Sequence, residues 1–137
     1  MIKKHPQNPL IKPADVKPSI EGYKVLGAFN PGAINFGDEI LLLMRVAEGT
    51  EPRKNYARVP TYHFEQGKAS PDILEFELTD PDVTLKDTRG VAYRGKDYLS
   101  TMSHIRLARS LDGVNFTVED KPFIYPLDES QKYGVED

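Results

Sequence analysis

Short apolar runs separated by turn-forming residues dominate the chain after residue 22. The runs are rich in Val, Ile, Leu, Tyr and Phe, and Gly, Pro, Asn and Asp stand between them. No stripe with helical spacing continues beyond two turns, so the pattern favours strands and predicts an all-β fold. The expected strands are Val25–Phe29, Ala33–Phe36, Ile40–Ala47, Ala57–Phe64, Ile73–Leu78, Val91–Arg94, Tyr98–Ser103, Ile105–Ser110 and Phe123–Tyr125.

Several connections between these runs have the sequence of a tight hairpin turn. A glycine lies between β-like runs in Phe36–Glu39, Glu65–Lys68 and Arg94–Asp97, where glycine adopts a positive φ without steric cost. Ser110–Val114 contains Asp-Gly, a strong turn signal. Residues 1–22 differ, because their four prolines fix φ and favour extended backbone. We expect an extended surface lead-in over 1–22 and a β domain over 23–137.

Composition narrows the class of protein. The 137 residues are 39% hydrophobic and 28% charged, which is typical of one globular domain. A net charge of −3 and scattered basic residues argue against nucleic acid as a partner. The chain has no cysteine, which excludes disulfides and thiolate chemistry, and its three histidines have no metal-ligand spacing. The longest apolar run, Ile40–Met44, is too short to span a membrane, and no secretory signal precedes it. We expect a cytoplasmic protein without a metal.

Two hairpins share residues at a constant offset, which indicates a tandem unit. Gly32 and Gly90 are 58 positions apart, as are Gly37 and Gly95, and the offset also matches Leu41 with Leu99 and Met44 with Met102. The alternative is a chance similarity of two hairpins. A period of this length is typical of propeller blades, each a small antiparallel sheet. Two blades cannot close a ring, because a blade buries its faces only against its neighbours.

Three positions inside the pattern are candidate ligand contacts. Asn30 in Asn30-Pro-Gly is either a turn residue or an amide that binds a hydroxylated ligand. Arg45 ends the apolar run, so its guanidinium needs an anionic or hydroxyl partner unless it extends to water. His104 shares a strand face with Arg106 and Ala108, as either a structural histidine or a site residue.

The adjacent carboxylates Glu136 and Asp137 are the acid candidates. A carboxylic acid in a sugar-binding cleft can protonate a leaving glycosidic oxygen if desolvation or a neighbouring like charge raises its pKa. The other reading is an ordinary acidic terminus.

Four segments together resemble glycoside hydrolase family 130, the β-mannoside phosphorylases and related mannosidases. They are Asn30-Pro-Gly-Ala-Ile, Leu43-Met-Arg-Val, Ser103-His-Ile-Arg-Leu-Ala-Arg-Ser-Leu-Asp-Gly-Val-Asn-Phe and Tyr133-Gly-Val-Glu-Asp, in this order. The resemblance implies a five-bladed β-propeller, of which this chain would cover about the first two blades. It also implies that Asp137 is the general acid and that Asn30, Arg45, His104 and Glu136 lie at the mannosyl site.

The implied reaction is a single displacement with inversion on a β-mannoside oligosaccharide. Phosphate or water attacks the anomeric carbon while the aspartate protonates the leaving oxygen, in some members through a sugar hydroxyl. No cofactor is implied, and inorganic phosphate would be a co-substrate of a phosphorylase. The family's phosphate-binding residues lie beyond residue 137, so phosphorolysis and hydrolysis stay open, and we expect the 137-residue chain to be inactive alone.

Two other readings stay open. The chain is also consistent with a non-catalytic carbohydrate-binding β-domain, complete as written, in which Asn30 and Arg45 contact a glycan. Alternatively, open sheet edges and faces would make it a structural piece that forms a homo-oligomer.

Overall fold

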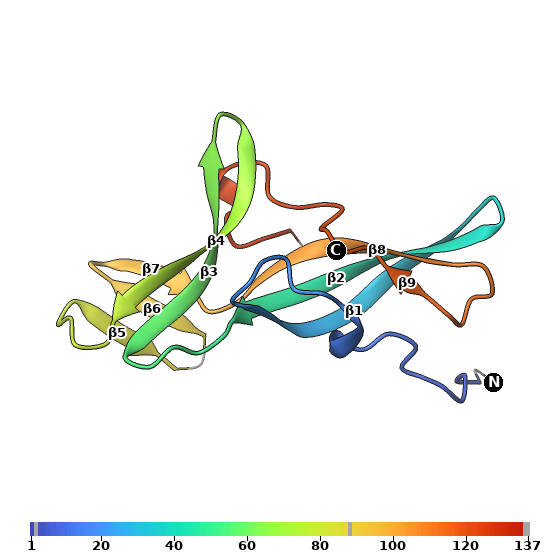
Figure 1. The fold of residues 1–137 in the computed structure, drawn as a ribbon, viewed down its shortest axis with the longest axis horizontal. Coiled ribbons are helices and arrows are strands. Elements are labelled where there is room, and N and C mark those ends of the chain that lie inside the picture. Colours follow the sequence, from blue (N-terminus) through green and yellow to red (C-terminus); the bar gives the residue numbers. More distant parts are fainter. Residues whose placement is uncertain (2, 88, 136–137) are drawn as a thin grey trace.

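The structure of the chain, a computed structural model, consists of antiparallel β-sheets (Figure 1). It describes residue 1, residues 3–87 and residues 89–135. Within these ranges the helical segments are two short 3-10 turns, Pro13–Asp15 and Glu129–Gln131. The prediction of an all-β fold is confirmed.

The central sheet combines the first two strands with strands from the end of the chain. β1 (Tyr23–Phe36) and β2 (Glu39–Thr50) form a long hairpin, β8 (Met102–Ser110) pairs with β2, and β9 (Thr117–Val118) pairs with β8. All three pairings are antiparallel. β8 is therefore a central strand, and its residues lie beside β2 although some 60 positions separate them, for example Arg45 and Ile105.

Two smaller sheets pack against each other beside this central sheet. β3 (Tyr56–Glu65) pairs with β4 (Lys68–Glu77), and β5 (Val83–Lys86), β6 (Gly90–Tyr93) and β7 (Lys96–Leu99) form a meander. Ala57, Val59 and Val91 are the buried centre of the core between these two sheets. Burying such side chains supplies the main stabilisation of the contact.

A second core joins the β3–β4 hairpin to the central sheet. Tyr23, Tyr62 and Met102 are buried together, and Ile20 and Ile73 pack against them. The Tyr23 hydroxyl donates a 2.6 Å hydrogen bond to the carbonyl oxygen of Asp72. The hairpin tip extends away from both cores (Figure 1).

Most of the predicted strands are present, with three informative differences. Val25–Phe29 and Ala33–Phe36 form one strand, β1, because Asn30 and its neighbours make a bulge rather than a turn. Phe123–Tyr125 is not a strand, and only a single bridge joins Ile124 to Ile105. The prediction missed β5 and β9, which are only four and two residues long.

The expected tight turns at Gly37, Gly67 and Gly95 are confirmed, whereas Ser110–Val114 belongs to a longer connection between β8 and β9. The turns at Gly37 and Gly95 do not align under the offset of 58. Gly37 is the first of the two residues between β1 and β2, whereas Gly95 is the second of the two between β6 and β7. A Cβ on Gly90 would collide with the carbonyl oxygen of Tyr98, while Gly32 has open space around it. The two hairpins are thus not equivalent position by position. None of the sheets of the described residues closes on itself, and the number of blades stays a prediction.

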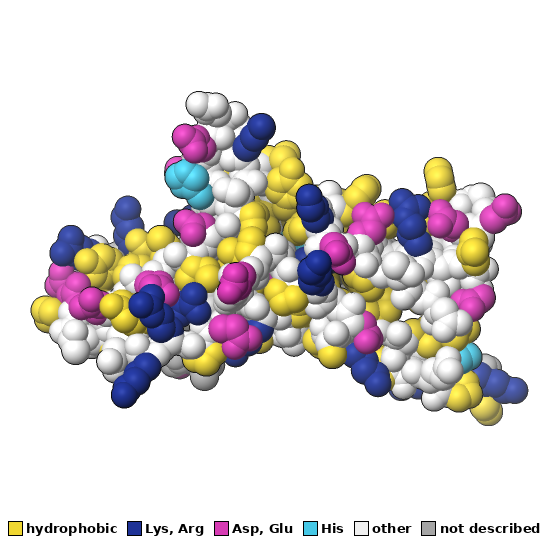
Figure 2. All heavy atoms as spheres, in the orientation of Figure 1, with side chains coloured by type: hydrophobic (Ala, Val, Ile, Leu, Met, Phe, Trp, Pro, Cys, Tyr) yellow, Lys and Arg dark blue, Asp and Glu magenta, His cyan; other side chains and the backbone are white. Residues whose placement is uncertain are grey.

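The lead-in lies against the central sheet over part of its length. Val16 is buried, and Ser19 is hydrogen-bonded to Glu48 of β2. Figure 2 shows acidic and basic side chains interspersed over the visible face. Among the described residues, no helix is long and apolar enough to cross a membrane.

Candidate functional site

Asn30 lies in a bulge on β1, an edge strand of the central sheet. The pairing of β1 with β2 shifts between Phe29, opposite Arg45, and Gly32, opposite Leu43. Asn30 has a φ of 50°, in the left-handed region that asparagine tolerates better than most residues. Bulges re-aim side chains next to binding sites. The Asn30 amide is exposed at this point.

Arg45 lies beside Phe29 on the same face of the sheet. Its guanidinium carbon is 5.1 Å from the centroid of the Phe29 ring, a cation–π arrangement. The sequence predicted Arg45 at the end of an apolar run, near the end of a strand expected over Ile40–Ala47, but β2 continues to Thr50, so the arginine is in mid-strand. Leu43, two residues earlier on the same face, is exposed, whereas Arg45 is half-buried.

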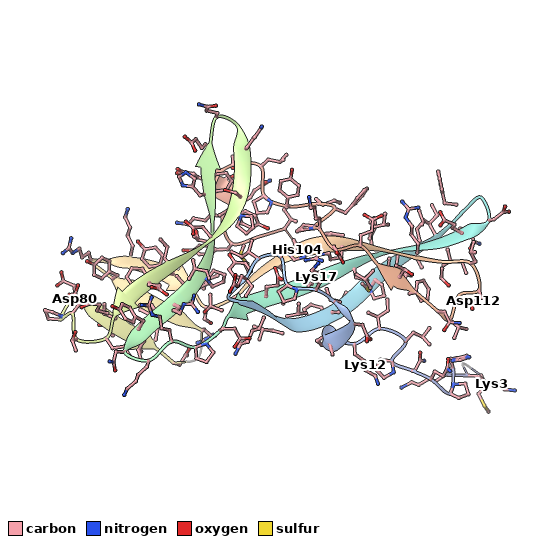
Figure 3. All side chains as sticks on the ribbon, viewed as in Figure 1. Lys3, Lys12, Lys17, Asp80, His104 and Asp112 are labelled. Carbon is pink, nitrogen blue, oxygen red and sulfur yellow. The ribbon has the colours of Figure 1, made fainter. Side chains whose placement is uncertain are left out.

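His104 is on the opposite face of the sheet from Arg45. In the pairing of β2 with β8, His104 is opposite Val46, and Arg45 is opposite Ile105. Adjacent residues of a strand point to opposite faces. The His104 side chain is fully buried, and Figure 3 places it at the middle of the central sheet. The structure therefore does not bring His104 to the face that carries Arg45, and its placement favours the structural reading.

A buried polar network surrounds His104. The Arg106 Nε donates a 2.8 Å hydrogen bond to His104 Nε2, and His104 Nδ1 is 3.5 Å from Glu48 Oε2. Arg106 also donates to Ser19 Oγ at 3.0 Å and to the Glu119 carbonyl oxygen at 3.0 Å. The amide and the hydroxyl of Ser19 both donate to the Glu48 carboxylate. The network thereby fixes the lead-in to β2 and β8.

Burial and charge determine the protonation states in this network. Desolvation and the neighbouring Arg106 lower the pKa of His104 to about 3, so the imidazole is neutral and its Nε2 accepts a hydrogen bond. Desolvation raises the pKa of Glu48, although hydrogen bonds from Ser19 and the charge of Arg106 oppose this shift. Desolvation lowers the pKa of Arg106. Arginine still stays charged, and its pairing with Glu48 compensates the burial of both charges.

The segment before Glu136 lies along β8. The amide of Val135 donates a 2.9 Å hydrogen bond to the Ser103 carbonyl oxygen, and the Ser103 amide donates to the Tyr133 carbonyl oxygen at 3.3 Å. Gly134 and Ser103 form a parallel bridge. Glu136 and Asp137, the predicted acid residues, lie outside the described residues.

Strand spacing gives the separation between this segment and the other predicted site residues. Segment 133–135 is one strand away from β8, and β8 is one strand away from β2. Strands in a sheet are about 4.8 Å apart, so the backbone of segment 133–135 is about 10 Å from that of β2. Arg45 lies at nearly the same position along the strand direction as this segment. The fold thus brings the Tyr133–Val135 part of the final motif to the same sheet as Asn30 and Arg45.

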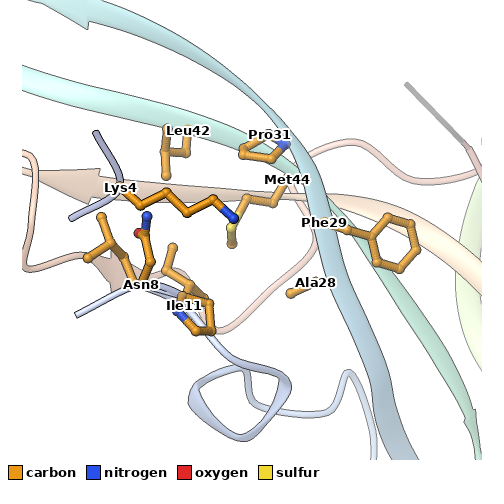
Figure 4. Close-up of a pocket in the computed structure, with 10 residues that line it drawn as sticks. Lys4, Asn8, Ile11, Ala28, Phe29, Pro31, Leu42 and Met44 are labelled. Atoms are coloured by element: carbon orange, nitrogen blue, oxygen red, sulfur yellow. The ribbon is translucent and has the colours of Figure 1, made fainter. Parts of the chain in front are cut away.

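A cleft of about 540 Å³ lies elsewhere, between the lead-in and the β1–β2 hairpin (Figure 4). Met44 and Leu42 contribute from β2, and Leu10 and Ile11 from the lead-in. Figure 4 shows the ring of Phe29 pointing away from Lys4 and Met44. The described residues include no cluster of three or more His, Asp or Glu side chains that could hold a metal ion.

Sequence analysis missed Ser19, Glu48 and Ser103. The sequence predicted that Arg106 shares a strand face with His104, and in the structure this arginine is buried, so its guanidinium requires a carboxylate partner. Glu48 meets this requirement from β2 through its charge, although the register puts it opposite Met102 and puts Met44 opposite Arg106. Ser103 carries no such signal, because its role depends on main-chain contacts with residues 133–135.

Comparisons with known proteins show that this chain is similar to part of a carbohydrate-active enzyme. No family model matches the chain. A β-1,2-mannobiose phosphorylase of Listeria innocua serovar 6a is 40% identical over 141 aligned positions, which cover 99% of this chain and 39% of that enzyme. The solved structure of the Listeria innocua β-1,2-mannobiose phosphorylase in complex with β-1,2-mannobiose matches with a TM-score of 0.75 at 40% identity, and covers 97% of this chain and 38% of that one.

The chain is therefore a homologue of a β-1,2-mannobiose phosphorylase, and its all-β fold matches that enzyme's structure. It spans less than two fifths of the relative's length.

Proposed function

We propose that this chain is part of a β-mannoside phosphorylase of glycoside hydrolase family 130. The observation that carries the proposal is the similarity along nearly the whole chain to an enzyme whose structure holds β-1,2-mannobiose. In this proposal residues 23–137 contribute about two blades of a five-bladed propeller, with 1–22 as the lead-in. The substrate is a β-mannoside, and inorganic phosphate is the co-substrate.

The exposed face of β1 and β2 supplies the sugar contacts in this proposal. Asn30 offers both a donor and an acceptor to sugar hydroxyls, and Arg45 offers donors beside the Phe29 ring. Apolar and aromatic surface next to a few polar groups is the usual make-up of a small-molecule site. Asn30 directly follows Phe29, which is the residue of β1 that pairs with Arg45.

Asp137 is the general acid of the proposed reaction, and Glu136 is its neighbour at the site. Phosphate attacks the anomeric carbon, the bond from that carbon to the glycosidic oxygen breaks, and Asp137 transfers its proton to the leaving oxygen. Attack from the opposite side inverts the configuration, so a β-mannoside yields α-mannose 1-phosphate. A single enzymic carboxyl is enough when phosphate is itself the nucleophile, whereas water would need a base.

A titration of the 137-residue chain with β-1,2-mannobiose tests the sugar-binding part of the proposal. We expect saturable shifts of the Arg45 and Asn30 signals in NMR spectra, and no shifts with cellobiose. Arg45→Lys should weaken binding by about tenfold, because lysine lacks the planar fork of donors. Arg94→Lys is the matched control, since Arg94 also lies over an aromatic ring, that of Tyr93, but in another sheet. Equal binding of both disaccharides would contradict the proposal.

The same chain should show no phosphate-dependent turnover by itself. By the family resemblance, the residues that hold phosphate belong to other parts of the enzyme. Release of mannose 1-phosphate by the purified 137-residue chain would overturn this expectation. Binding without turnover is also what the alternative, a carbohydrate-binding domain, predicts. An assay of the enzyme encoded by the full reading frame separates the two.

A further inference from the structure

We propose that Ser103 and Gly134 form a dock that positions the proposed acid, Asp137, relative to the central sheet. The inference deepens the proposed function and depends on it for the role of Asp137. Ser103 acts through the segment that it holds and is therefore a positioning residue. The dock is supported by three hydrogen bonds of Ser103, by a steric requirement at Gly134 and by a second anchor at Tyr133.

The contacts join Ser103 to both sides of Gly134. The Val135 amide donates to the Ser103 carbonyl oxygen at 2.9 Å, and the Ser103 amide donates to the Tyr133 carbonyl oxygen at 3.3 Å. The Ser103 hydroxyl donates a further hydrogen bond to the Val135 carbonyl oxygen, at 3.2 Å. Segment 133–135 thus extends the central sheet by one short parallel piece beyond β8.

Gly134 is required by the closeness of this contact. Its φ of 114° is a conformation that residues with a side chain rarely adopt. A Cβ at this position would be 2.6 Å from the Ser103 amide nitrogen and would overlap the Ser103 carbonyl oxygen. Both atoms belong to the backbone of a central strand and have little freedom to move. Any larger residue at position 134 therefore displaces the segment from β8.

A second anchor lies on a different sheet. The Tyr133 hydroxyl donates a 2.6 Å hydrogen bond to the carbonyl oxygen of Asp97 in β7. The segment is held between β8 and β7, and its direction is fixed as well as its position. Tyr133→Phe removes this anchor without changing the contacts of Ser103.

The strand that carries the dock, β8, is held in place by buried contacts. Ser103 is almost fully buried, and its neighbours in β8, His104 and Arg106, belong to the buried network with Glu48. Asp137 is two residues beyond Val135, and two residues of extended chain span at most about 7 Å. In this proposal the dock limits the reach of the two residues that follow Val135, and a limited reach is what a general acid needs.

Hydrogen exchange of the Val135 amide in the 137-residue chain tests the dock without any ligand. We expect protection in the wild type, and about fivefold faster exchange in Ser103→Ala, which loses one neutral hydrogen bond. Ser103→Thr keeps the hydroxyl and should restore protection. Ser110→Ala is the matched control, because Ser110 is a buried β8 serine whose hydroxyl bonds to Asp112 instead. Gly134→Val should bring exchange to within about twofold of that in the free peptide Tyr-Gly-Val-Glu-Asp. An unprotected Val135 in the wild type would overturn the dock.

The positioning role has its own readout, the carboxyl carbon signal of Asp137 during titration with β-1,2-mannobiose. We expect this signal to shift in the wild type and in Ser103→Thr, and to stop responding in Gly134→Val while the Arg45 signals still respond. A wild-type response at Arg45 without one at Asp137 would overturn the positioning role. No response at any residue would contradict the proposed function, and the exchange data would still decide whether the dock exists.

Discussion

Asn30 combines an exposed amide with a backbone conformation that few residues accept. Its φ of 50° lies in the left-handed region, where a Cβ meets the following carbonyl oxygen and an ordinary residue loses about 1 kcal/mol. Glycine accepts this conformation but has no amide. Substitutions at this position therefore separate the backbone contribution from the ligand contact.

We predict that Asn30→Gly retains the unfolding free energy of the wild type within about 0.5 kcal/mol but binds β-1,2-mannobiose about five to ten times more weakly. Asn30→Ala should lose the same binding and, in addition, about 1 kcal/mol of stability. Urea unfolding and calorimetric titration measure the two quantities. Wild-type affinity in Asn30→Gly would exclude the amide as a sugar ligand.

The network around His104 should make stability depend on pH. The folded state lowers the pKa of His104 from 6.5 to about 3, so between these values the unfolded chain binds more protons than the folded one. The unfolding free energy then falls as the pH decreases from about 6.5, by at most about 1.4 kcal/mol per pH unit from this group. The raised pKa of Glu48 acts in the opposite direction and reduces the slope.

We expect urea unfolding of the wild type to show this loss between pH 6.5 and 4. In His104→Asn the histidine contribution is absent, so the curve should be flatter over the same range, although the substitution lowers stability at pH 7 as well. Equal slopes in the two proteins would show that His104 is not held neutral by the fold.

At the scale of elements, local turn residues predicted the hairpins. Long-range strand pairing determined how the hairpins are arranged in sheets. Gln66-Gly67 and Arg94-Gly95 both have positive φ at the two central residues, which matches the twist of the adjoining strands. These turns were predictable because glycine in a two-residue loop is a local signal. The pairing of β2 with β8 has no local sequence signal. It determines both the buried network and the position of Arg45 in the sheet.

The bulge in β1 contains a local turn signal that does not end the strand. Asn30-Pro-Gly is a typical turn sequence, and we expected it to separate two strands. In the structure the β1–β2 pairing resumes after the irregularity, so tertiary pairing overrides the turn tendency. For the site, the sequence predicted which residues of β8 share a face, but not the opposite placement of Arg45 and His104.

The pair Gly32 and Gly90, matched by the offset of 58, provides a prediction about elements. A Cβ at Gly90 would collide with the Tyr98 carbonyl oxygen across the β6–β7 pair, whereas the space around Gly32 is open. Gly90→Ala should lower the unfolding free energy by about 2 kcal/mol, and Gly32→Ala should change it by less than about 0.5 kcal/mol. Thermal or urea unfolding measures both. Similar losses would indicate that the two hairpins are equivalent after all.

At the scale of the whole molecule, the central sheet leaves an apolar face in contact with solvent. Phe29, Ile34, Phe36 and Leu43 are all at least 37% exposed, and the β1–β2 register puts them on the face that carries Arg45. Exposed apolar surface of this kind promotes association between protein surfaces. The chain spans less than two fifths of its relative, so in the proposed enzyme other parts of the protein would lie against the open sheets.

We predict that the 137-residue chain self-associates at micromolar concentration through the end of this face that carries Ile34 and Phe36, which is separated along the β1–β2 hairpin from Phe29 and Arg45. Phe36→Lys should shift the sedimentation coefficient towards the monomer, because it puts a charge in the centre of the contact. Leu85→Lys is the matched control, since Leu85 is similarly exposed but lies in β5 of another sheet. A wild type that sediments as a monomer at all concentrations would contradict the prediction.

The most direct test of the account is an assay of the full reading frame that contains this chain, from codon 1 to its natural stop. The account predicts phosphate-dependent conversion of β-1,2-mannobiose to α-mannose 1-phosphate and mannose. It also predicts a loss of at least about a hundredfold in Asp137→Asn, because the general acid is removed, and a smaller loss in Glu136→Gln. No phosphorolysis by the wild type, or unchanged activity in Asp137→Asn, would contradict it.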